Sequence, residues 1–308
     1  MGCSVSVVTA TYQRAGTLPR LWDSLLAQDA VDLEWVVVDD GSTDGTVELI
    51  RAWQQEAPFP VIYEWQRNQG KHAAINRGVE AASGEFCAVM DSDDWYVPGA
   101  LASMLAHWRA IPAGMQDQFA SVEGLSAEPG GELVGDRFPQ PTFDSNTFEI
   151  DAVHGVQGDT MGMYRRDVLL AHPFPEDLGW HISPALVWNR IAARYSTRFV
   201  NEIWAYKEYL PEGLSERDTE LRLRYAAAQL LYWREFAAMP RPMPLRAKLR
   251  AHANYVRYSL VEKKTLREQF EDSPSRRWTA LAWVIGALLL TRDRVRVRRG
   301  FAEPSTSP

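Results

Sequence analysis

In the stretch Phe86-Cys87-Ala88-Val89-Met90-Asp91-Ser92-Asp93-Asp94, a short apolar run ends in three carboxylates. The run predicts a buried strand, and in an open α/β sheet the carboxyl ends of the strands border the ligand crevice. Mg²⁺ and Mn²⁺ bind carboxylate oxygens together with substrate phosphates. Asp93 and Asp91, in a D-x-D arrangement, are therefore candidate metal ligands. An acidic turn that only ends the strand explains the cluster equally well.

A second acidic strand end favours the ligand site. The β-branched run at residues 33–38 predicts a strand, and Asp39 and Asp40 follow it directly. A third run, residues 4–9, predicts the first strand and leads to Tyr12. We therefore expect carboxylates from two strands, and an aromatic ring, at one edge of the sheet.

Helical patterns separate these strands. Apolar residues at 18–26 repeat at helix spacing, and a second helix is expected after residue 44. A strand at 61–65 and a helix of small residues at 70–78 follow. Strand and helix thus alternate through roughly the first hundred residues, which predicts the α/β class with a Rossmann-like, mostly parallel sheet.

With these segments in this order, the chain resembles the family 2 glycosyltransferases, which have the GT-A fold. Residues 7–14, 37–44, 68–78 and 91–94 carry the resemblance, and residues 155–215 match more loosely. It implies a sheet flanked by helices with a helical C-terminal extension. It also implies an inverting hexosyltransferase that uses Mn²⁺ or Mg²⁺. The donor would be a nucleoside-diphosphate sugar, with UDP expected, and the acceptor a cell-envelope polysaccharide or a lipid-linked saccharide.

The resemblance also implies roles for single residues. Asp39 or Asp40 would accept a hydrogen bond from a uracil N–H, Tyr12 would pack near the base, and Lys71 would lie near the phosphates. The alternatives are a turn-capping Asp40, a core position for Tyr12 and a solvated Lys71. The residues expected to contact the nucleotide-sugar are Ala10, Tyr12, Arg14, Asp39, Asp40, Asn68, Lys71, Asp91 and Ser92.

The general base is not supplied by the residue expected from the resemblance. Members of the resembled family often carry an acidic residue just before a Leu-x-Trp-Asn-Arg segment, which is residues 186–190 here, but Pro184 stands where we expect it. Asp177, then His181, then Asp159 are the substitutes, since an acceptor hydroxyl must lose its proton to a group within hydrogen-bond reach.

Two alternatives stay open. One, favoured by Pro184, is a nucleotide-sugar-binding protein without transfer activity, and the other is a different nucleotide-using α/β enzyme such as a nucleotidyltransferase. A dinucleotide dehydrogenase is disfavoured because no G-x-G-x-x-G follows the first strand, and the sequence contains no P-loop.

Composition agrees with a cytoplasmic enzyme. The chain has 308 residues, 46% of them hydrophobic, and a net charge of −7, so no nucleic-acid partner is expected. Its two cysteines, Cys3 and Cys87, indicate a reducing compartment. Residues 4–9 predict a strand rather than the apolar core of a leader, so no secretion signal is expected.

The chain is expected to divide at residue 212. Residues 1–212 would form the GT-A domain, with a nucleotide-sugar half at 1–110 and an acceptor half at 111–212. Within it, residues 112–148 are expected to be an insertion or a mobile loop. Residues 213–308 would be helical. Seven arginines and one aspartate in 276–300 flank a thirteen-residue apolar segment, which is shorter than the ~20 residues of a spanning helix. It predicts either a packed final helix or peripheral contact with the inner face of the cell membrane.

Overall fold

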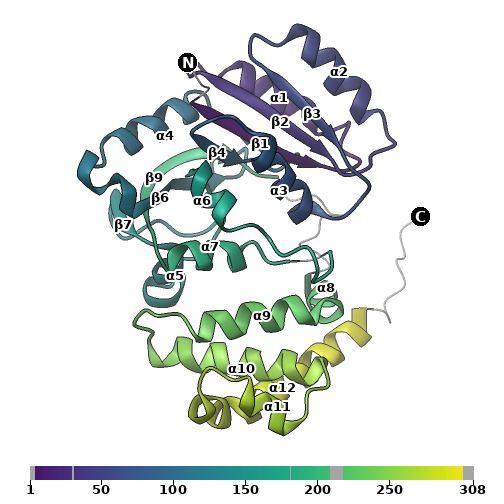
Figure 1. The fold of residues 1–308 in the computed structure, drawn as a ribbon, viewed down its shortest axis with the longest axis vertical. Helices are drawn as coiled ribbons and strands as arrows, with labels where there is room; N and C mark the ends of the chain where they lie inside the picture. Colours follow the sequence, from purple (N-terminus) through teal and green to yellow (C-terminus); the bar gives the residue numbers. More distant parts are fainter. Residues whose placement is uncertain (1–3, 30, 181, 209–217, 301–308) are drawn as a thin grey trace. The chain divides into compact units, whose positions relative to one another are not determined.

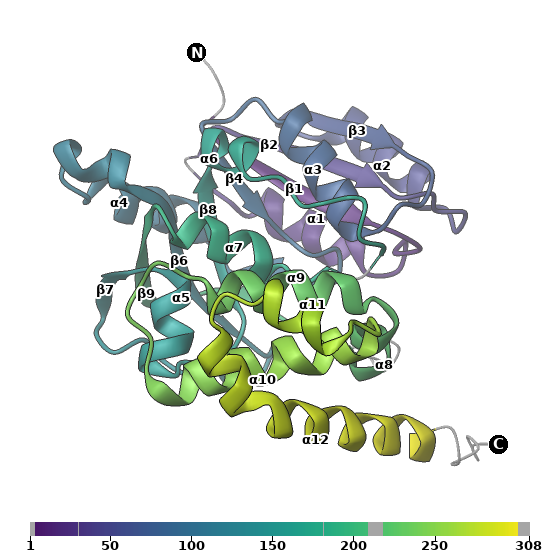
Figure 2. The same ribbon diagram turned by 60° about the horizontal axis from the view of Figure 1, so that its bottom comes forward.

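The computed structural model describes residues 4–29, 31–180, 182–208 and 218–300. The chain forms two compact units, residues 1–175 with 190–209, and residues 176–189 with 210–308. The predicted α/β fold is confirmed in the first unit (Figure 1), and the predicted C-terminal helices belong to the second (Figure 2). The division of the first unit into a donor half and an acceptor half stays a prediction.

A nine-stranded sheet forms the centre of the first unit in the described part of the chain. Its order is β3 (Val61–Trp65), β2 (Leu33–Asp39), β1 (Val5–Thr11), β4 (Phe86–Val89), β8 (Thr160–Arg165), β6 (Phe119–Ala127), β9 (Ser196–Tyr206) and β5 (Trp95–Tyr96), with β7 (Thr142–Ser145) paired to β9. Strands β3, β2, β1 and β4 are parallel, whereas β8 is antiparallel to both β4 and β6. Thr11 pairs with Asp39 and Val8 with Val89, so β1, β2 and β4 end at one edge.

Two helices cover one face of the parallel strands. α1 (Leu18–Leu26) and α2 (Thr46–Glu56) lie on the same side (Figure 1). Trp22 of α1 and Trp53 of α2 pack together with Trp35 of β2. The ring centroids of Trp22 and Trp53 are 5.2 Å apart, and those of Trp35 and Trp53 are 5.6 Å apart. These large buried rings contribute much of the apolar area that this layer removes from water.

The opposite face is covered by α3 (Lys71–Ala81), and a glycine permits its close approach. A Cβ at Gly78 would lie 2.4 Å from Val8 Cγ1 and 3.3 Å from Val38 Cγ2. Such a distance is far shorter than a van der Waals contact, so no larger residue fits between this helix and the sheet. The small residues of segment 70–78 therefore bring the N-terminus of α3 to the edge where the strands end.

The prediction of a loop at residues 112–148 is wrong. Within it, β6 is buried throughout and lies between β8 and β9 in the sheet. The strand was missed because Ser121 and Glu123 make its sequence polar. Their side chains are satisfied inside the protein: Ser121 Oγ lies 2.8 Å from Thr197 Oγ1, and Glu123 accepts hydrogen bonds from the hydroxyls of Thr160 and Tyr164.

The remaining helices of the first unit are short. They are α4 (Ala100–Arg109), η1 (Ala113–Gln118), α5 (Thr147–Glu149), η2 (Ile150–His154) and α6 (Arg166–Ala171). α7 (Ala185–Ala192) follows Pro184, whose carbonyl accepts the N–H groups of Val187 and Trp188. Pro184 thus begins a helix, where its missing N–H has no cost.

The second unit is helical. It contains α8 (Asp218–Arg224), α9 (Ala226–Ala237), α10 (Leu245–Val261), α11 (Leu266–Glu271) and α12 (Arg276–Gly300). α10 lies between α9 and α12 (Figure 2). Tyr255 and Tyr258 of α10 are almost fully buried in this bundle.

Candidate active site

The three aspartates after β4 form one acidic cluster. A carboxylate oxygen from each of Asp91, Asp93 and Asp94 lies within 4.8 Å of the others. A turn closed by the Asp94 N–H on the Asp91 carbonyl, at 3.2 Å, brings them together. The Asp91 and Asp93 side chains are 32% and 26% exposed, whereas Asp94 is buried. Ser92 is buried in the same turn.

Each carboxylate faces a basic side chain from a different element. Lys71 Nζ lies 2.6 Å from Asp91 Oδ1, Lys207 Nζ lies 2.9 Å from Asp94 Oδ2, and the Arg14 guanidinium is 3.7 Å from Asp93 Oδ2. The cluster therefore carries three acidic and three basic groups. The contact of Asp93 is the loosest of the three.

These charges set the ionisation of the cluster. Burial works to raise the pKa of Asp91, but Lys71, Lys207 and Arg14 outweigh it and the pKa lies below its ordinary value. Burial raises the pKa of Asp94 to about 6, with Lys207 opposing the rise and Asp91 adding to it. Burial lowers the pKa of Lys207, but the surrounding carboxylates raise it overall, so this ammonium stays charged.

The two aspartates after β2 are both enclosed, to different degrees. Asp39 has no exposed surface and accepts hydrogen bonds from the Ser42 N–H at 2.8 Å and the Tyr63 hydroxyl at 2.9 Å. Asp40 is 4% exposed. Its Oδ1 accepts from Gln66 Nε2 at 2.7 Å and the Gln69 N–H at 2.8 Å, and its Oδ2 accepts from the Gly70 N–H at 2.8 Å. Asp40 thus has a small exposed surface that Asp39 lacks.

The two acidic strand ends meet through the start of α3. Gly70 donates its N–H to Asp40, and the next residue, Lys71, pairs with Asp91. Asn68 also lies here, since a Cβ at Gly41 would be 3.2 Å from its backbone nitrogen. The structure therefore brings the predicted base-side and phosphate-side residues to one edge of the sheet.

The residues from β1 occupy the same edge. Ala10 is the residue before the last in β1. It pairs with Val38 of β2 and is partly exposed. Tyr12 is 48% exposed, which contradicts a core position for this ring. Gln13, at φ 54°, donates its N–H to Ser42 Oγ at 2.9 Å and so ties the end of β1 to the loop after Asp40.

The three candidate bases have different outcomes. Asp159 lies 3.6 Å from Lys207 Nζ and is 51% exposed, so one ammonium joins it to Asp94. A cavity of about 120 Å³ beside Asp159 is lined by Glu123 and Phe138 among others. Asp177 belongs to the second unit and stays a prediction, and His181 lies outside the described residues.

Sequence reasoning missed Lys207. It directly follows β9, which pairs with β6 and β5. Its side chain is 14% exposed and contacts two carboxylates from segments far apart in sequence. The one sequence signal for a role was its position after a strand. That signal was not used, because β6, which pairs with this strand, was not predicted.

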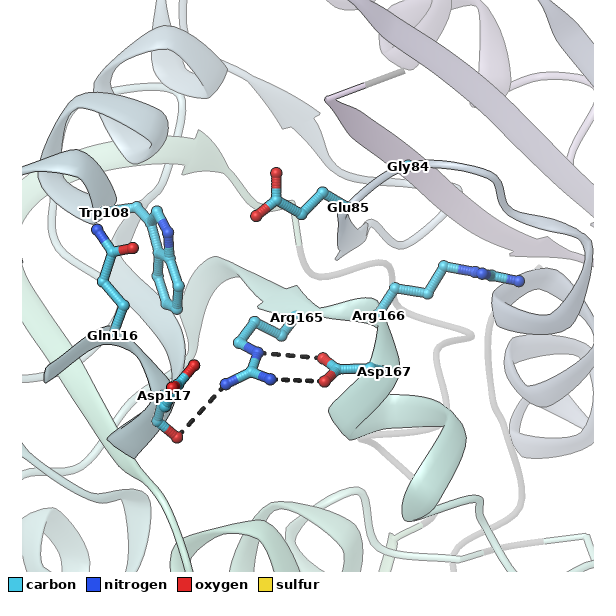
Figure 3. Close-up of a pocket in the computed structure, with 8 residues that line it drawn as sticks. All are labelled: Gly84, Glu85, Trp108, Gln116, Asp117, Arg165, Arg166 and Asp167. Carbon is cyan, nitrogen blue, oxygen red and sulfur yellow. Dashed lines mark hydrogen bonds and ion pairs between the residues drawn. The ribbon is translucent and has the colours of Figure 1, made fainter. Parts of the chain in front are cut away.

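A larger cavity, of about 370 Å³, lies at the beginning of β4 rather than its end (Figure 3). Arg165 projects into it, but its guanidinium is bonded to Asp167 on one side and to the Asp117 carbonyl on the other (Figure 3). Trp108 forms part of the wall. The Arg165 guanidinium is thus already engaged, and this cavity lies away from the aspartate cluster after β4.

Comparison with known proteins identifies the family. Residues 6–171, more than half of the chain, match the family model of Glycosyl transferase family 2. The chain belongs to this family. It is a glycosyltransferase with the GT-A fold, as predicted, and the nucleotidyltransferase alternative is not supported.

Two curated relatives illustrate the match. An uncharacterized glycosyltransferase, alr2836 of Nostoc sp., is 42% identical over 67% of this chain and 63% of its own length. The succinoglycan biosynthesis protein ExoO of Rhizobium meliloti is 38% identical over 45% of this chain and 40% of its own. The chain thus spans about two-fifths to three-fifths of the length of these relatives.

The fold is shared with a solved structure. The S. aureus TarS 1-349 structure in complex with UDP-GlcNAc superposes with a TM-score of 0.58 and 16% identity, covering 96% of this chain and 92% of that one. At this identity the similarity shows the fold alone.

Proposed function

We propose that this glycosyltransferase moves a sugar from a UDP-sugar, with inversion at the anomeric carbon and with a divalent metal ion, to a cell-envelope polysaccharide or a lipid-linked saccharide. The observation that carries the proposal is the junction of Asp40, Lys71 and the aspartate cluster at one sheet edge. The name of the ExoO relative, a polysaccharide biosynthesis protein, and the UDP-GlcNAc bound by TarS support the acceptor and donor classes.

The cluster fits Mn²⁺ or Mg²⁺. Its donors are carboxylate oxygens, which these ions prefer, and two of the three carboxylates are partly exposed. Asp93 would be the principal ligand because its basic partner is the most distant at 3.7 Å, with Asp91 the second ligand. The metal would supply Lewis-acid stabilisation of the departing diphosphate.

The protein's own cations would share that task. Lys71 pairs with Asp91 and Arg14 with Asp93, and the two basic side chains are partly exposed, at 42% and 34%. Each can turn from its carboxylate to a phosphate oxygen. An ammonium and a guanidinium aimed at developing negative charge stabilise the transition state more than the ground state.

Asp40 would bind the base. Asp40 is 4% exposed and its Oδ2 accepts the Gly70 N–H, whereas Asp39 has no exposed surface and would position the loop through Ser42. The exposed ring of Tyr12 would pack on the base. Ala10, Asn68 and Ser92 would complete the nucleotide-sugar contacts.

Asp159 would serve as the general base. It is half exposed, borders the cavity of about 120 Å³ and is joined to the aspartate cluster by Lys207. An acceptor hydroxyl in that cavity would give its proton to Asp159 while attacking from the side opposite the diphosphate. Lys207, 3.6 Å away, would help to position the Asp159 carboxylate. Asp177 and His181 are the alternative bases.

A donor panel tests the proposal. UDP- and GDP-sugars are incubated with Mg²⁺, Mn²⁺ or EDTA, nucleotide release is measured, and the product's anomeric configuration is read by NMR. GDP-sugars belong in the panel because guanine also offers N–H donors to a carboxylate. We expect release from a UDP-sugar that EDTA abolishes. Asp93→Asn should lower it at least a hundredfold, whereas Asp23→Asn, an exposed matched control on α1, should not.

The same panel separates the alternatives. Metal-independent release would contradict the metal assignment, and retention of configuration would contradict an inverting mechanism. Saturable UDP binding without release from any donor would favour the binding protein without transfer activity. Asp159→Asn should lower turnover at least a hundredfold while donor binding persists, and unchanged turnover would pass the role of base to Asp177 or His181.

A further inference from the structure

α12 has two unlike faces. Its inner face packs on α10 through Thr279, Ala282 and Leu290, which are at most 5% exposed. On the other side, Leu281, Val284, Ile285 and Leu288 are 66%, 63%, 44% and 64% exposed. The helix therefore packs along one face, as one of the two predictions for this segment expected, and leaves an apolar face exposed; membrane contact stays a prediction.

The four exposed side chains form one stripe, which we call the outer stripe. Their spacing of three, four and seven residues places them on one side of an α-helix within two turns. Single exposed aliphatic residues are ordinary, but contiguous apolar patches on a protein surface mark an interaction site. The outer stripe is such a patch.

Arginines stand at both ends of the outer stripe. Arg277 precedes Leu281 by four residues and Arg292 follows Leu288 by four, so both lie on the same side of the helix as the stripe. Both are exposed, Arg292 to 69%, with its nearest carboxylate oxygen 3.8 Å away on Asp293. Asp293 is the only acidic residue in segment 276–300, and it is buried and paired with Arg257. The exposed surface of α12 is thus apolar and positively charged.

Two further observations concern the helices and the tryptophans of α12. Within the described residues, no helix has the length and apolarity needed to cross a bilayer. The tryptophans do not belong to the outer stripe either. Trp283 donates its indole N–H to Gln269 Oε1 at 3.1 Å, and the ring of Trp278 lies 5.8 Å from Lys248 Nζ. The apolar contact must come from the aliphatic side chains of the outer stripe.

We propose that the outer stripe docks on an anionic phospholipid surface with α12 lying parallel to it. Leucine, valine and isoleucine side chains would enter the boundary between headgroups and acyl chains, and Arg277 and Arg292 would contact lipid phosphates. This inference concerns the second unit and does not depend on the proposed donor, metal or base.

Charge argues against a second copy of the chain as the occupant. The stripe is symmetric about its midpoint, between Val284 and Ile285. An antiparallel pair of stripes would therefore set Arg277 opposite Arg292 of the second copy at both ends, and like charges facing one another are destabilising. An anionic surface has no such repulsion, and it attracts both arginines.

Vesicle binding by the full chain tests the proposal. Sedimentation with phosphatidylglycerol/phosphatidylcholine vesicles at low salt should capture the protein, and vesicles of phosphatidylcholine alone should capture at least tenfold less. Leu281→Gln with Leu288→Gln should weaken binding to the anionic vesicles at least tenfold. The matched control is Leu245→Gln with Leu266→Gln, which removes two leucines that are 61% and 58% exposed elsewhere in the same unit. Control binding equal to that of the stripe variant would overturn the assignment.

Two double variants test the role of the arginines separately. Arg277→Gln with Arg292→Gln should weaken binding at least fivefold, whereas Arg276→Gln with Arg294→Gln, which removes the same charge on another side of the helix, should change it less than twofold. Equal losses would overturn their role in docking. Light scattering in parallel must show the same oligomeric state for parent and stripe variant. A dimer that the stripe variant loses, without vesicle binding by the parent, would assign the stripe to a second copy and overturn the proposal.

Discussion

Asp40 and Asp91 follow different strands, yet they contact consecutive residues: Gly70 donates its N–H to Asp40 Oδ2 at 2.8 Å, and Lys71 Nζ lies 2.6 Å from Asp91 Oδ1. The start of α3 is thus a fixed bridge between the two acidic loops. Gly78 makes the bridge possible, because it lets α3 lie against β1 and β2. Packing on one face of the sheet therefore sets the distance between the base-binding and phosphate-binding ends of the proposed donor site.

Asp40→Asn tests this bridge. An amide offers one acceptor oxygen in place of two, so at least one of the Gln66, Gln69 and Gly70 donors loses its partner. A buried donor left without a partner costs about 1–3 kcal/mol. We expect urea denaturation to show an unfolding free energy lower by about 2 kcal/mol, and titration calorimetry to show UDP affinity at least tenfold weaker. Asp23→Asn should leave both unchanged. An Asp40→Asn protein with the parent's stability would contradict the bridging role.

The sequence predicted the parallel half of the sheet because its signals are local. Asp39 and Asp40 directly follow an unbroken β-branched run, and Asp91 directly follows an apolar run. Each short segment therefore predicts both a strand and the carboxylates at its end. It did not predict β6, because the burial of Glu123 depends on hydroxyls from Thr160 and Tyr164 that only the folded sheet brings near. Lys207 was missed for the same reason.

Lys207→Met tests the link between Asp94 and Asp159. Lys207 now lowers the pKa of Asp94, which burial raises to about 6, so removing the ammonium should move that pKa higher. We expect kcat to fall at least a hundredfold at pH 6.5, the acidic limb of the kcat profile to shift to higher pH, and donor KM to change less than fivefold. Lys207→Arg keeps the charge and should recover at least tenfold of the loss. An unshifted pH profile would leave Lys207 with a purely structural role.

His252 gives the second unit a pH dependence. It is 2% exposed, its Nδ1 lies 3.0 Å from Thr279 Oγ1 of α12, and burial lowers its pKa from 6.5 to about 4. The folded protein resists protonation, so this contribution to stability is complete above pH 6.5 and is lost as pH falls toward 4. We expect the unfolding free energy to drop on the order of 2 kcal/mol more in the parent than in His252→Gln over that interval. Exposed His154→Gln should follow the parent, and parallel curves for His252→Gln and parent would refute the prediction.

Gly286 in α12 sets two effects against each other. Alanine is favoured over glycine by about 1 kcal/mol inside a helix, so propensity alone predicts that Gly286→Ala stabilises the protein. However, the added Cβ would lie 2.5 Å from the Ala253 carbonyl oxygen and 2.8 Å from Val256 Cβ. The backbone oxygen cannot rotate away, and overpacking of this kind costs about 1–3 kcal/mol. We expect the steric effect to prevail and the unfolding free energy to fall by up to about 2 kcal/mol, the overpacking cost less the propensity gain. Gly114→Ala, where a Cβ meets nothing within 4 Å, is the control and should be neutral. A more stable Gly286→Ala protein would mean that α12 packs less closely on α10 than these distances require.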